Sequence, residues 1–417
     1  MTAATALARR SVAPIIALIA FAIFINYIDR GNLSIAAPLI KSELHISASQ
    51  LGFLLTAFFI TYVPMQLLVG VLVERYGGGT VLLAGFLLWS LATIVTGFTA
   101  NFVQLFACRL LLGVGESVTF PAMSKLLAEH VDEQLRGLAN GVVQAGLAFG
   151  PAFGVFSGGL LTAAYGWRFF FIGFGISSLI WAFFWWVFAQ SRAQEVQRSH
   201  RARQAVPMRE ILQQPSLWGA SIGHFCGNFV LYFNITWIPY YLVHERHWSL
   251  AQMSAISGTS FLVSGCSCIA AGQLADVLIR RGDSRTRVRK SCWVVGGIGL
   301  GLSLFICGYS SDLVSAASLV AAGFFAGIFG LNTYIVGQTR GGPAACGRWT
   351  GVQNFLANIA GLIAPSITGV LVDRTGSFKL PFTIASTLAF VGVVAWVFLT
   401  GPLEPIAWLA ESESVPR

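Results

Sequence analysis

The stretch LGFLLTAFFITYVPMQLLVGVLVERYGG, residues 51–78, contains the pattern that decides the fold of this chain. Its first 23 residues carry no charged side chain, and Glu74 and Arg75 follow them directly. A helix needs about 20 mostly apolar residues to cross a bilayer, because it rises about 1.5 Å per residue. Residues 51–73 are therefore predicted to be one membrane crossing that ends at this acidic and basic pair.

The composition extends this interpretation to the whole chain. Of the 417 residues only 10% are charged and 55% are hydrophobic, whereas about 25% are charged in ordinary soluble proteins. A water-soluble globule is excluded by these values. The apolar runs are continuous and do not alternate as outer-membrane strands do, so we predict an all-α polytopic membrane protein.

Twelve apolar runs bounded by Gly, Pro or charge are predicted to be transmembrane helices. They cover residues 13–36, 51–73, 80–98, 103–127, 137–163, 168–190, 217–243, 252–277, 291–309, 314–338, 348–372 and 379–401.

Lys and Arg are distributed unequally over the loops. If the crossings alternate, nineteen basic residues lie on the side of the N-terminus, while the other side receives only Lys41, Arg168, Arg246, Arg374 and Lys379. A Lys and Arg surplus in short loops marks the cytoplasmic side. Both termini are therefore predicted to be cytoplasmic, in a multi-pass protein of the cell inner (plasma) membrane. The net charge of +9 then reflects topology, and we expect no nucleic-acid partner.

The chain is predicted to contain two related halves. A shift of 202 residues aligns Gly70 and Glu74 with Gly272 and Asp276, and a shift of 210 residues aligns Gln144 with Asn354. Such internal symmetry is typical of transporters, whose binding site lies between the repeats near the middle of the membrane. The predicted boundaries are an N-terminal six-helix half at 1–190, a cytoplasmic linker at 191–215, a C-terminal six-helix half at 216–401 and a cytoplasmic tail at 402–417.

Few ionisable residues lie inside the predicted crossings, where each costs on the order of 3 kcal/mol on insertion scales. The first helix contains Asp29 and Arg30, and the fourth contains Arg109 and Glu116. One interpretation is structural ion pairing between the first and fourth helices. The functional interpretation, which we favour, is that an Arg fork binds a carboxylate while a carboxyl group in a poorly solvated cavity accepts a proton.

Uncharged polar residues in the crossings are candidates for the same cavity, although each one alone more often makes an ordinary interhelical hydrogen bond. They are Tyr27, Tyr62, Gln144, Asn332, Thr333, Tyr334, Asn354 and Asn358. For His224 we favour a neutral packing role over proton relay, because it is predicted to stand near the cytoplasmic end of its helix.

Glu74, Arg75 and Asp276 lie where two predicted helices leave the membrane. Such charges can anchor a helix end at the interface, or they can gate the protein by switched ion pairs. We favour gating, because both halves carry the feature. The seven cysteines lie mostly in apolar runs, and the Cys266 and Cys268 pair lacks a second pair to complete a metal site. We therefore expect no metal, no cofactor and no enzymatic activity.

These residues resemble known transporters. The run Gly70-Val-Leu-Val-Glu74-Arg75-Tyr76-Gly77 resembles the loop between helices two and three of the major facilitator superfamily, with Glu for the usual Asp and Gly78-Gly79 for the usual basic pair. Asn26-Tyr-Ile-Asp-Arg30, Gly113-Val-Gly-Glu-Ser117 and Gly166-Trp-Arg168 resemble the anion:cation symporter branch, which includes galactonate, glucarate, hexuronate and phthalate carriers.

The resemblance implies the major facilitator fold, with twelve helices in two six-helix repeats, and a monomeric state. It also implies that Asp29 and Glu116 accept protons and that Arg30 and Arg109 pair with them or with a substrate carboxylate. Residues implied to contact the ligand directly are Tyr27, Tyr62, Gln144, Thr333 and Asn354.

Two functions remain open at this point. The first is proton-coupled symport of a small organic anion, such as a sugar acid or another carboxylate, by alternating access. The second is proton-coupled export of drugs, because Gly146-Leu-Ala-Phe-Gly150-Pro151-Ala-Phe-Gly154 resembles the helix-five signature of drug:proton antiporters. Two buried arginines make a poor pocket for cations, so symport is favoured.

Overall fold

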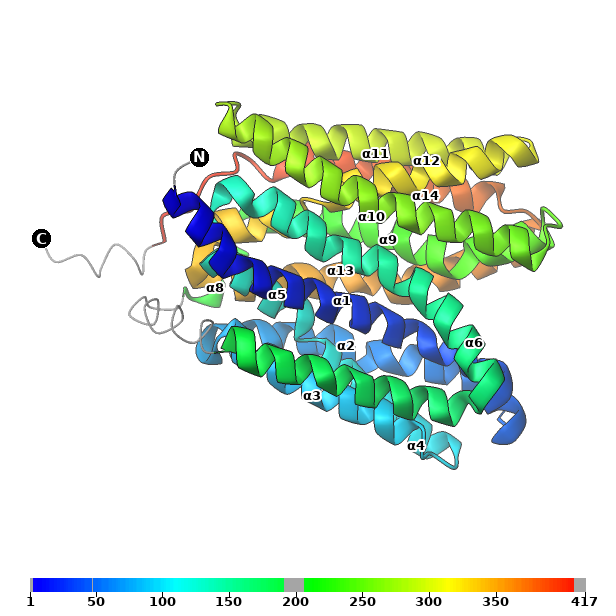
Figure 1. Ribbon diagram of the computed structural model, residues 1–417. Coiled ribbons are helices and arrows are strands. Elements are labelled where there is room, and N and C mark those ends of the chain that lie inside the picture. Colours follow the sequence, from blue (N-terminus) through cyan, green and yellow to red (C-terminus); the bar gives the residue numbers. More distant parts are fainter. Residues whose placement is uncertain (1–2, 47, 191–205, 409–417) are drawn as a thin grey trace, which may run out of the picture.

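The computed structural model describes residues 3–46, 48–190 and 206–408, and within them the chain is helical without any strand. The helices lie side by side along one direction (Figure 1). Their bounds are α1 Ala3–Glu43, α2 Ala48–Tyr76, α3 Gly78–Thr96, α4 Phe102–Glu116, α5 Thr119–His130, α6 Arg136–Trp185, α8 Met208–Leu212, α9 Pro215–His244, α10 Leu250–Arg280, α11 Arg285–Tyr309, α12 Asp312–Gly330, α13 Gly342–Thr375 and α14 Lys379–Val394.

The helices support the predicted crossings. Ten helical stretches in the described parts of the chain are long and apolar enough to span a membrane. The other two predicted crossings, 137–163 and 217–243, coincide with the first part of α6 and with α9. The predicted loop between residues 163 and 168 is a reversal inside α6, where Gly166 has φ 81°. This value lies in the region that glycine adopts at little cost.

Two predicted crossings are less regular than expected. The run 103–127 is interrupted between α4 and α5, at residues 117–118. The run 314–338 ends early: α12 stops at Gly330, and a π-helical turn at Gly337–Gly341 precedes Gly342, which has φ 59°. Irregular backbone in a membrane is tolerated where it is enclosed by protein, and residues 331–339 are all buried.

The apolar core falls into two large clusters. One cluster is drawn from residues between Ile15 and Ala189, with Tyr334 as its single fully buried member from later in the chain. The other cluster is drawn from residues between Val206 and Trp408. This partition agrees with the predicted halves, whose boundaries remain a prediction. Residues 191–205 of the linker and 409–417 of the tail lie outside the described residues.

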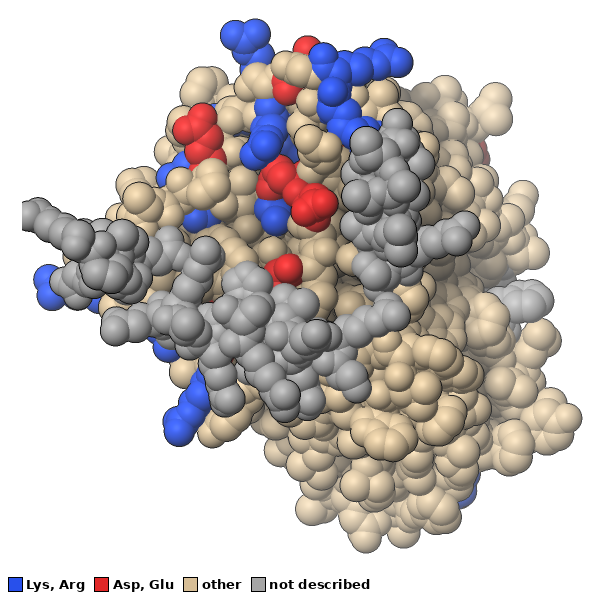
Figure 2. Space-filling view, turned by 60° about the vertical axis from the view of Figure 1, so that its left-hand side comes forward, with Lys and Arg blue, Asp and Glu red and all other residues tan. Residues whose placement is uncertain are grey.

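One end of the bundle carries most of the exposed charge. We call it the terminal face, because α1 begins there, while α2 and α10 end there (Figure 1). Figure 2 shows Lys, Arg, Asp and Glu side chains gathered on this end of the molecule. Exposed arginines on it are Arg75, Arg209, Arg280, Arg281, Arg285 and Arg287.

The described part of the predicted tail packs against the terminal face. The backbone N–H of Leu403 donates to the Thr286 hydroxyl at 3.0 Å, and that of Ile406 donates to the Arg340 carbonyl at 3.0 Å. The Trp408 indole donates to the Gly341 carbonyl at 3.2 Å. Residues 402–408 therefore cover the π-helical turn before α13.

Candidate functional site

A cavity of about 150 Å³ lies between α1 and α6 on one side and α9, α10, α12 and α13 on the other. No charged side chain of the described residues lines it. Of the eight uncharged candidates from the sequence, Tyr62 and Asn332 do not line the cavity. The six that do are Tyr27, Gln144, Thr333, Tyr334, Asn354 and Asn358.

His224, in the first third of α9, also lines the cavity. The helix begins at Pro215, so His224 lies about 14 Å along its axis. Its Nδ1 atom lies 3.4 Å from the Gln353 amide nitrogen, and its ring meets the Tyr334 ring edge-on at 5.3 Å between centroids. These contacts are those of a packed histidine at the cavity wall.

Arg30 lies directly behind the cavity wall, held by aromatic rings. Its guanidinium carbon lies 4.6 Å from the ring centroid of Tyr27 and 4.6 Å from that of Tyr62. Its Nη1 donates to the Tyr27 hydroxyl at 3.4 Å. Because Tyr27 lines the cavity, a single side chain separates the cavity from the positive charge.

The structure pairs Arg30 with Glu116. The Arg30 Nε donates to the Glu116 carboxylate at 3.0 Å, and 13% of the Arg30 side chain is exposed while the Glu116 side chain is fully buried. One oxygen of Glu116 and the Nη2 atom of Arg30 are buried without a partner among the described residues. The pair is thus formed through one contact only, and each member keeps a free hydrogen-bonding atom.

Asp29 and Arg109 do not form an ion pair with each other or with another described residue. Asp29 accepts hydrogen bonds from Asn32 and Thr93, both at 3.1 Å. Arg109 lies 5.4 Å from the centroid of the Phe58 ring, which Arg30 also approaches at 5.2 Å. The two arginines are therefore gathered around one aromatic ring beside the cavity.

Glu74 joins α2 to α5 and α13 at the terminal face. Its carboxylate accepts a hydrogen bond from Lys125 Nζ at 2.6 Å and another from the backbone N–H of Gly347 at 2.7 Å. Lys125 also pairs with Glu129 at 3.2 Å. Arg75 lies outside this network: it is exposed, with its guanidinium 5.3 Å from the ring of Tyr76.

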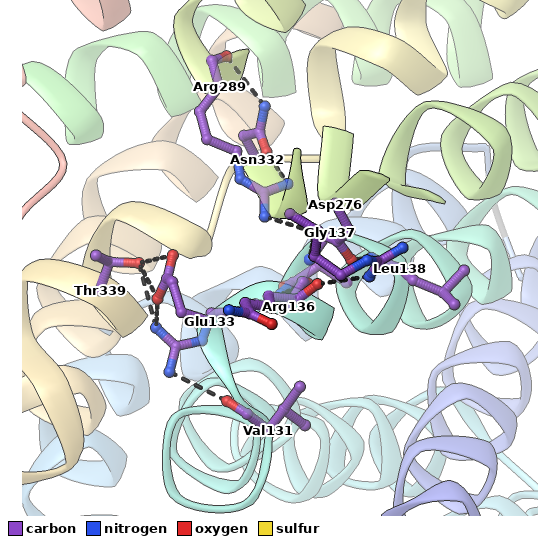
Figure 3. A network of polar contacts seen from close by, with 12 residues as sticks. Val131, Glu133, Arg136, Gly137, Leu138, Asp276, Arg289, Asn332 and Thr339 are labelled. Carbon is purple, nitrogen blue, oxygen red and sulfur yellow. Dashed lines mark hydrogen bonds and ion pairs between the residues drawn. The ribbon is translucent and has the colours of Figure 1, made fainter. Parts of the chain in front are cut away.

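Asp276 makes the equivalent connection from α10 to the start of α6. It accepts hydrogen bonds from the backbone N–H groups of Gly137 at 3.0 Å and Leu138 at 2.7 Å. It also forms an ion pair with Arg289 of α11 at 2.9 Å, and both side chains are 1% exposed. Figure 3 shows Arg289 reaching down to Asp276 beside the first turn of α6.

A neighbouring network was not predicted from the sequence. Arg136 contacts the Glu133 carboxylate, the Thr339 hydroxyl at 3.2 Å and the Val131 carbonyl at 3.2 Å. Thr339 in turn donates to Glu133 at 3.0 Å, and these groups converge in Figure 3. Thr339 belongs to the π-helical turn, so the irregular segment is tied to the start of α6.

No cluster of His, Cys, Asp and Glu suited to a metal ion occurs in the described ranges. The arrangement contains instead a central cavity, buried charges beside it, and ion pairs and hydrogen bonds between helices at one end. A comparison with family models decides the class: residues 19–286 match the model of the Major Facilitator Superfamily. The chain belongs to the major facilitator superfamily. It is therefore a multi-pass membrane transporter and not an enzyme, as the sequence predicted.

Individual relatives support this membership over nearly the whole length. The chain is 30% identical to the hexuronate transporter of Bacillus subtilis (strain 168), with 94% of this chain and 95% of the relative covered. It is 30% identical to the probable sulfoacetate transporter SauU of Cupriavidus necator, with 90% of this chain and 91% of the relative covered. The fold is similar to that of the proton:xylose symporter XylE at a TM-score of 0.74 and 15% identity, with 97% of this chain and 99% of that chain covered.

Proposed function

We propose that this transporter is a proton-coupled symporter of a small organic anion, working by alternating access between two six-helix halves, 1–190 and 216–401. We place it in the cell inner membrane as a monomer, with both termini and the terminal face on the cytoplasmic side. The surplus of Lys and Arg at that face supports the orientation. Relatives that carry hexuronate and, as a probable activity, sulfoacetate support an anionic substrate.

The observation that carries the proposal is the position of Arg30. Its guanidinium stands behind Tyr27 at the cavity wall and keeps one unpartnered nitrogen. A rotation of the Tyr27 ring would expose a guanidinium fork to a carboxylate in the cavity, which is the geometry that Arg binds best. Arg109, around the same Phe58 ring, adds a second positive charge to this side of the cavity.

Glu116 supplies the coupling to protons. Its carboxylate pairs with Arg30, so it would compete with an incoming anion for the same guanidinium. Protonation of Glu116 removes its negative charge and releases Arg30 to the substrate, so proton and anion bind together. Asp29, beside Arg30 in the chain, is the second proposed proton acceptor.

Gating is proposed for the terminal face. Glu74 and Asp276 each hold the start of a helix from the other half, so that both contacts must break for the cavity to open on that side. Arg75, the third residue predicted to take part in gating, is exposed and forms no ion pair within the described residues, so the proposed gate rests on Glu74 and Asp276.

The drug antiporter alternative is not favoured. A Cβ atom at Gly146 would lie 2.6 Å from the Ala20 carbonyl oxygen, and one at Gly150 would lie 2.7 Å from the Phe24 carbonyl oxygen. These glycines serve the close packing of α6 on α1, which accounts for the glycine pattern without drug export. The cavity of about 150 Å³ is also smaller than the roughly 300–1,000 Å³ of sites for drug-sized ligands.

Uptake into proteoliposomes tests the proposal. The purified chain is reconstituted with an acidic exterior, and accumulation of radiolabelled glucuronate, gluconate and sulfoacetate is compared with the release of a cationic dye loaded into the proteoliposomes. We expect at least one anion to accumulate, and a protonophore to abolish the accumulation. Transport of the cationic dye in exchange for protons, with no anion transported, would contradict the proposal.

A further inference from the structure

The part of the cavity formed by α9 and α10 contains polar groups to which the proposed anion and proton sites assign no role. Asn234 of α9 and Ser257 of α10 both line the cavity. The Oδ1 atom of Asn234 and the hydroxyl of Ser257 are buried and have no hydrogen-bond partner among the described residues. A buried polar group left unpaired costs free energy, so these atoms are a place where a ligand gains by binding.

Two further cavity groups share this property. The Oε1 atom of Gln144 and the Nδ2 atom of Asn354 are also buried without a partner in the described chain. The four groups include acceptors, a donor and a hydroxyl, and none is charged. A ligand hydroxyl both donates and accepts, so a chain of hydroxyls satisfies such a mixed neutral set, whereas a second carboxylate would find no cation.

We propose that Asn234 and Ser257 are specificity-determining residues that read hydroxyl groups on the uncharged part of the substrate. This inference rests on the proposed function, in which Arg30 holds the single anionic group at the Tyr27 end of the same cavity. The substrate class that fits is a polyhydroxylated monocarboxylate. A site built to hydrogen-bond hydroxyls rejects an analogue that lacks them, because its buried polar groups then remain unpaired.

The chain offers a matched control on the same helix. Ser260 lies one turn beyond Ser257 and also lines the cavity, but its hydroxyl donates to the Leu319 carbonyl at 2.8 Å. Asn358 is the corresponding control for Asn234, because its side chain accepts from the Tyr232 hydroxyl and donates to the Asn354 carbonyl, both at 2.8 Å. These two side chains are satisfied within the protein and have less to offer a ligand.

The test measures equilibrium binding of two six-carbon acids, gluconate with five hydroxyls and hexanoate with none, to the purified full chain. We expect the parent to prefer gluconate. Ser257→Ala and Asn234→Leu should each weaken gluconate binding about tenfold, the cost of one lost hydrogen bond. Neither change should weaken hexanoate binding, because each removes a polar group that hexanoate leaves unpaired. Ser260→Ala should leave the ratio of the two affinities as in the parent.

Three results would overturn the inference. They are equal binding of both acids by the parent, an equal loss of both acids in Ser257→Ala and Asn234→Leu, and binding of glucarate, a dicarboxylate, more tightly than gluconate. If the parent binds other organic anions but neither gluconate nor hexanoate, the assignment of Asn234 and Ser257 to substrate hydroxyls is wrong. The proposed symport of an organic anion would still hold. If it binds no anion at all, the proposed function fails as well.

Discussion

The Asp276 carboxylate accepts a hydrogen bond from the backbone N–H of Gly137, with 3.0 Å between oxygen and nitrogen. This contact connects the last turns of α10 to the first turn of α6. Glu74 holds Gly347 near the start of α13 in the same way, at 2.7 Å. The positive end of a helix dipole favours a carboxylate at such a place. The terminal face is thus closed by two contacts of one type, related by the internal repeat, although the accompanying cations, Lys125 and Arg289, come from different helices.

Replacing either carboxylate should open the terminal face. In Asp276→Asn and Glu74→Gln, the charge-assisted hydrogen bonds are weakened. We expect each change to lower the ratio of closed to open molecules about tenfold. Cys346, fully buried beside Gly347, provides a native reporter. Its rate of labelling by a membrane-impermeant maleimide, followed by mass spectrometry of its peptide, should rise in both variants.

Arg75 provides the control for this experiment. Because its side chain is exposed and forms no ion pair within the described chain, Arg75→Gln should change the labelling rate of Cys346 by less than twofold. If Arg75→Gln raised the labelling rate of Cys346 more than Asp276→Asn does, the terminal face would be held closed by attraction between its surface charges. The two contacts of Glu74 and Asp276 would then not be what closes it.

Gly137 should tolerate no side chain while the face is closed. An added Cβ atom would lie 2.4 Å from the Asp276 carboxylate and 2.7 Å from the Gly272 carbonyl. Overpacking of this kind costs typically 1–3 kcal/mol, so Gly137→Ala should raise Cys346 labelling as Asp276→Asn does. Gly173→Ala is the control, because its Cβ would come no closer than 3.9 Å to a neighbour. Unchanged labelling in Gly137→Ala would mean that the helices separate there without loss of the seal.

The opposite end of the bundle should respond to acid. Glu43 accepts hydrogen bonds from the Trp167 indole at 2.6 Å and from Arg168 at 2.9 Å, and these contacts lower the pKa of Glu43 below its usual 4.5. Because the pKa of Glu43 is lower in the folded than in the unfolded protein, its ionised form stabilises the fold at pH values above the unfolded-state pKa. This stabilisation is lost as the pH falls through the folded-state pKa. Between pH 6 and pH 3, the thermal unfolding temperature of Glu43→Gln should therefore fall less than that of the parent. Parallel curves would show that the contacts add no stability.

The buried charges and an ion pair between the first and fourth helices could be predicted from the sequence, but the partners in that pair could not. Asp29, Arg30, Arg109 and Glu116 are conspicuous because charge is rare in apolar runs. The spacing of Arg109 and Glu116 places them on one face of a helix, yet Glu116 pairs with Arg30 of α1. Which arginine reaches the carboxylate depends on how α1 packs against α4, and no local pattern encodes that distance.

Other residues gave no usable signal in the sequence. Lys125 is one of the nineteen basic residues that the charge pattern assigns to the loops on the side of the N-terminus, although the structure buries it against Glu74. Asn234 and Ser257 resemble the many polar residues that make ordinary hydrogen bonds between membrane helices. Only the structure shows that their polar atoms are unpaired at a cavity. The break between α12 and α13 falls at residues 331–341, where Asn332, Thr333 and Gln338 are the uncharged polar residues that precede Thr339 and Arg340. Their presence does not show where the helix ends, so the sequence predicted a longer helix.

Substitution of the two buried acids should separate coupling from binding. Glu116→Gln removes the competing charge from Arg30, so anion binding should become independent of pH between pH 5 and pH 8, whereas in the parent it should weaken as Glu116 ionises. Asp29 forms no ion pair with Arg30, and its two hydrogen-bond partners, Asn32 and Thr93, are neutral. Asp29→Asn should therefore keep the parent's pH dependence of binding.

Both variants should lose accumulation of anion against its gradient, because each removes one proposed proton acceptor, while exchange of internal for external anion at equal pH should persist. Glu43→Gln, which removes an exposed carboxyl group far from the cavity, should accumulate anion like the parent. Binding in Glu116→Gln that still varies with pH as in the parent would assign the proton to another group. Accumulation preserved in both Asp29→Asn and Glu116→Gln would reject these carboxyl groups as the coupling site.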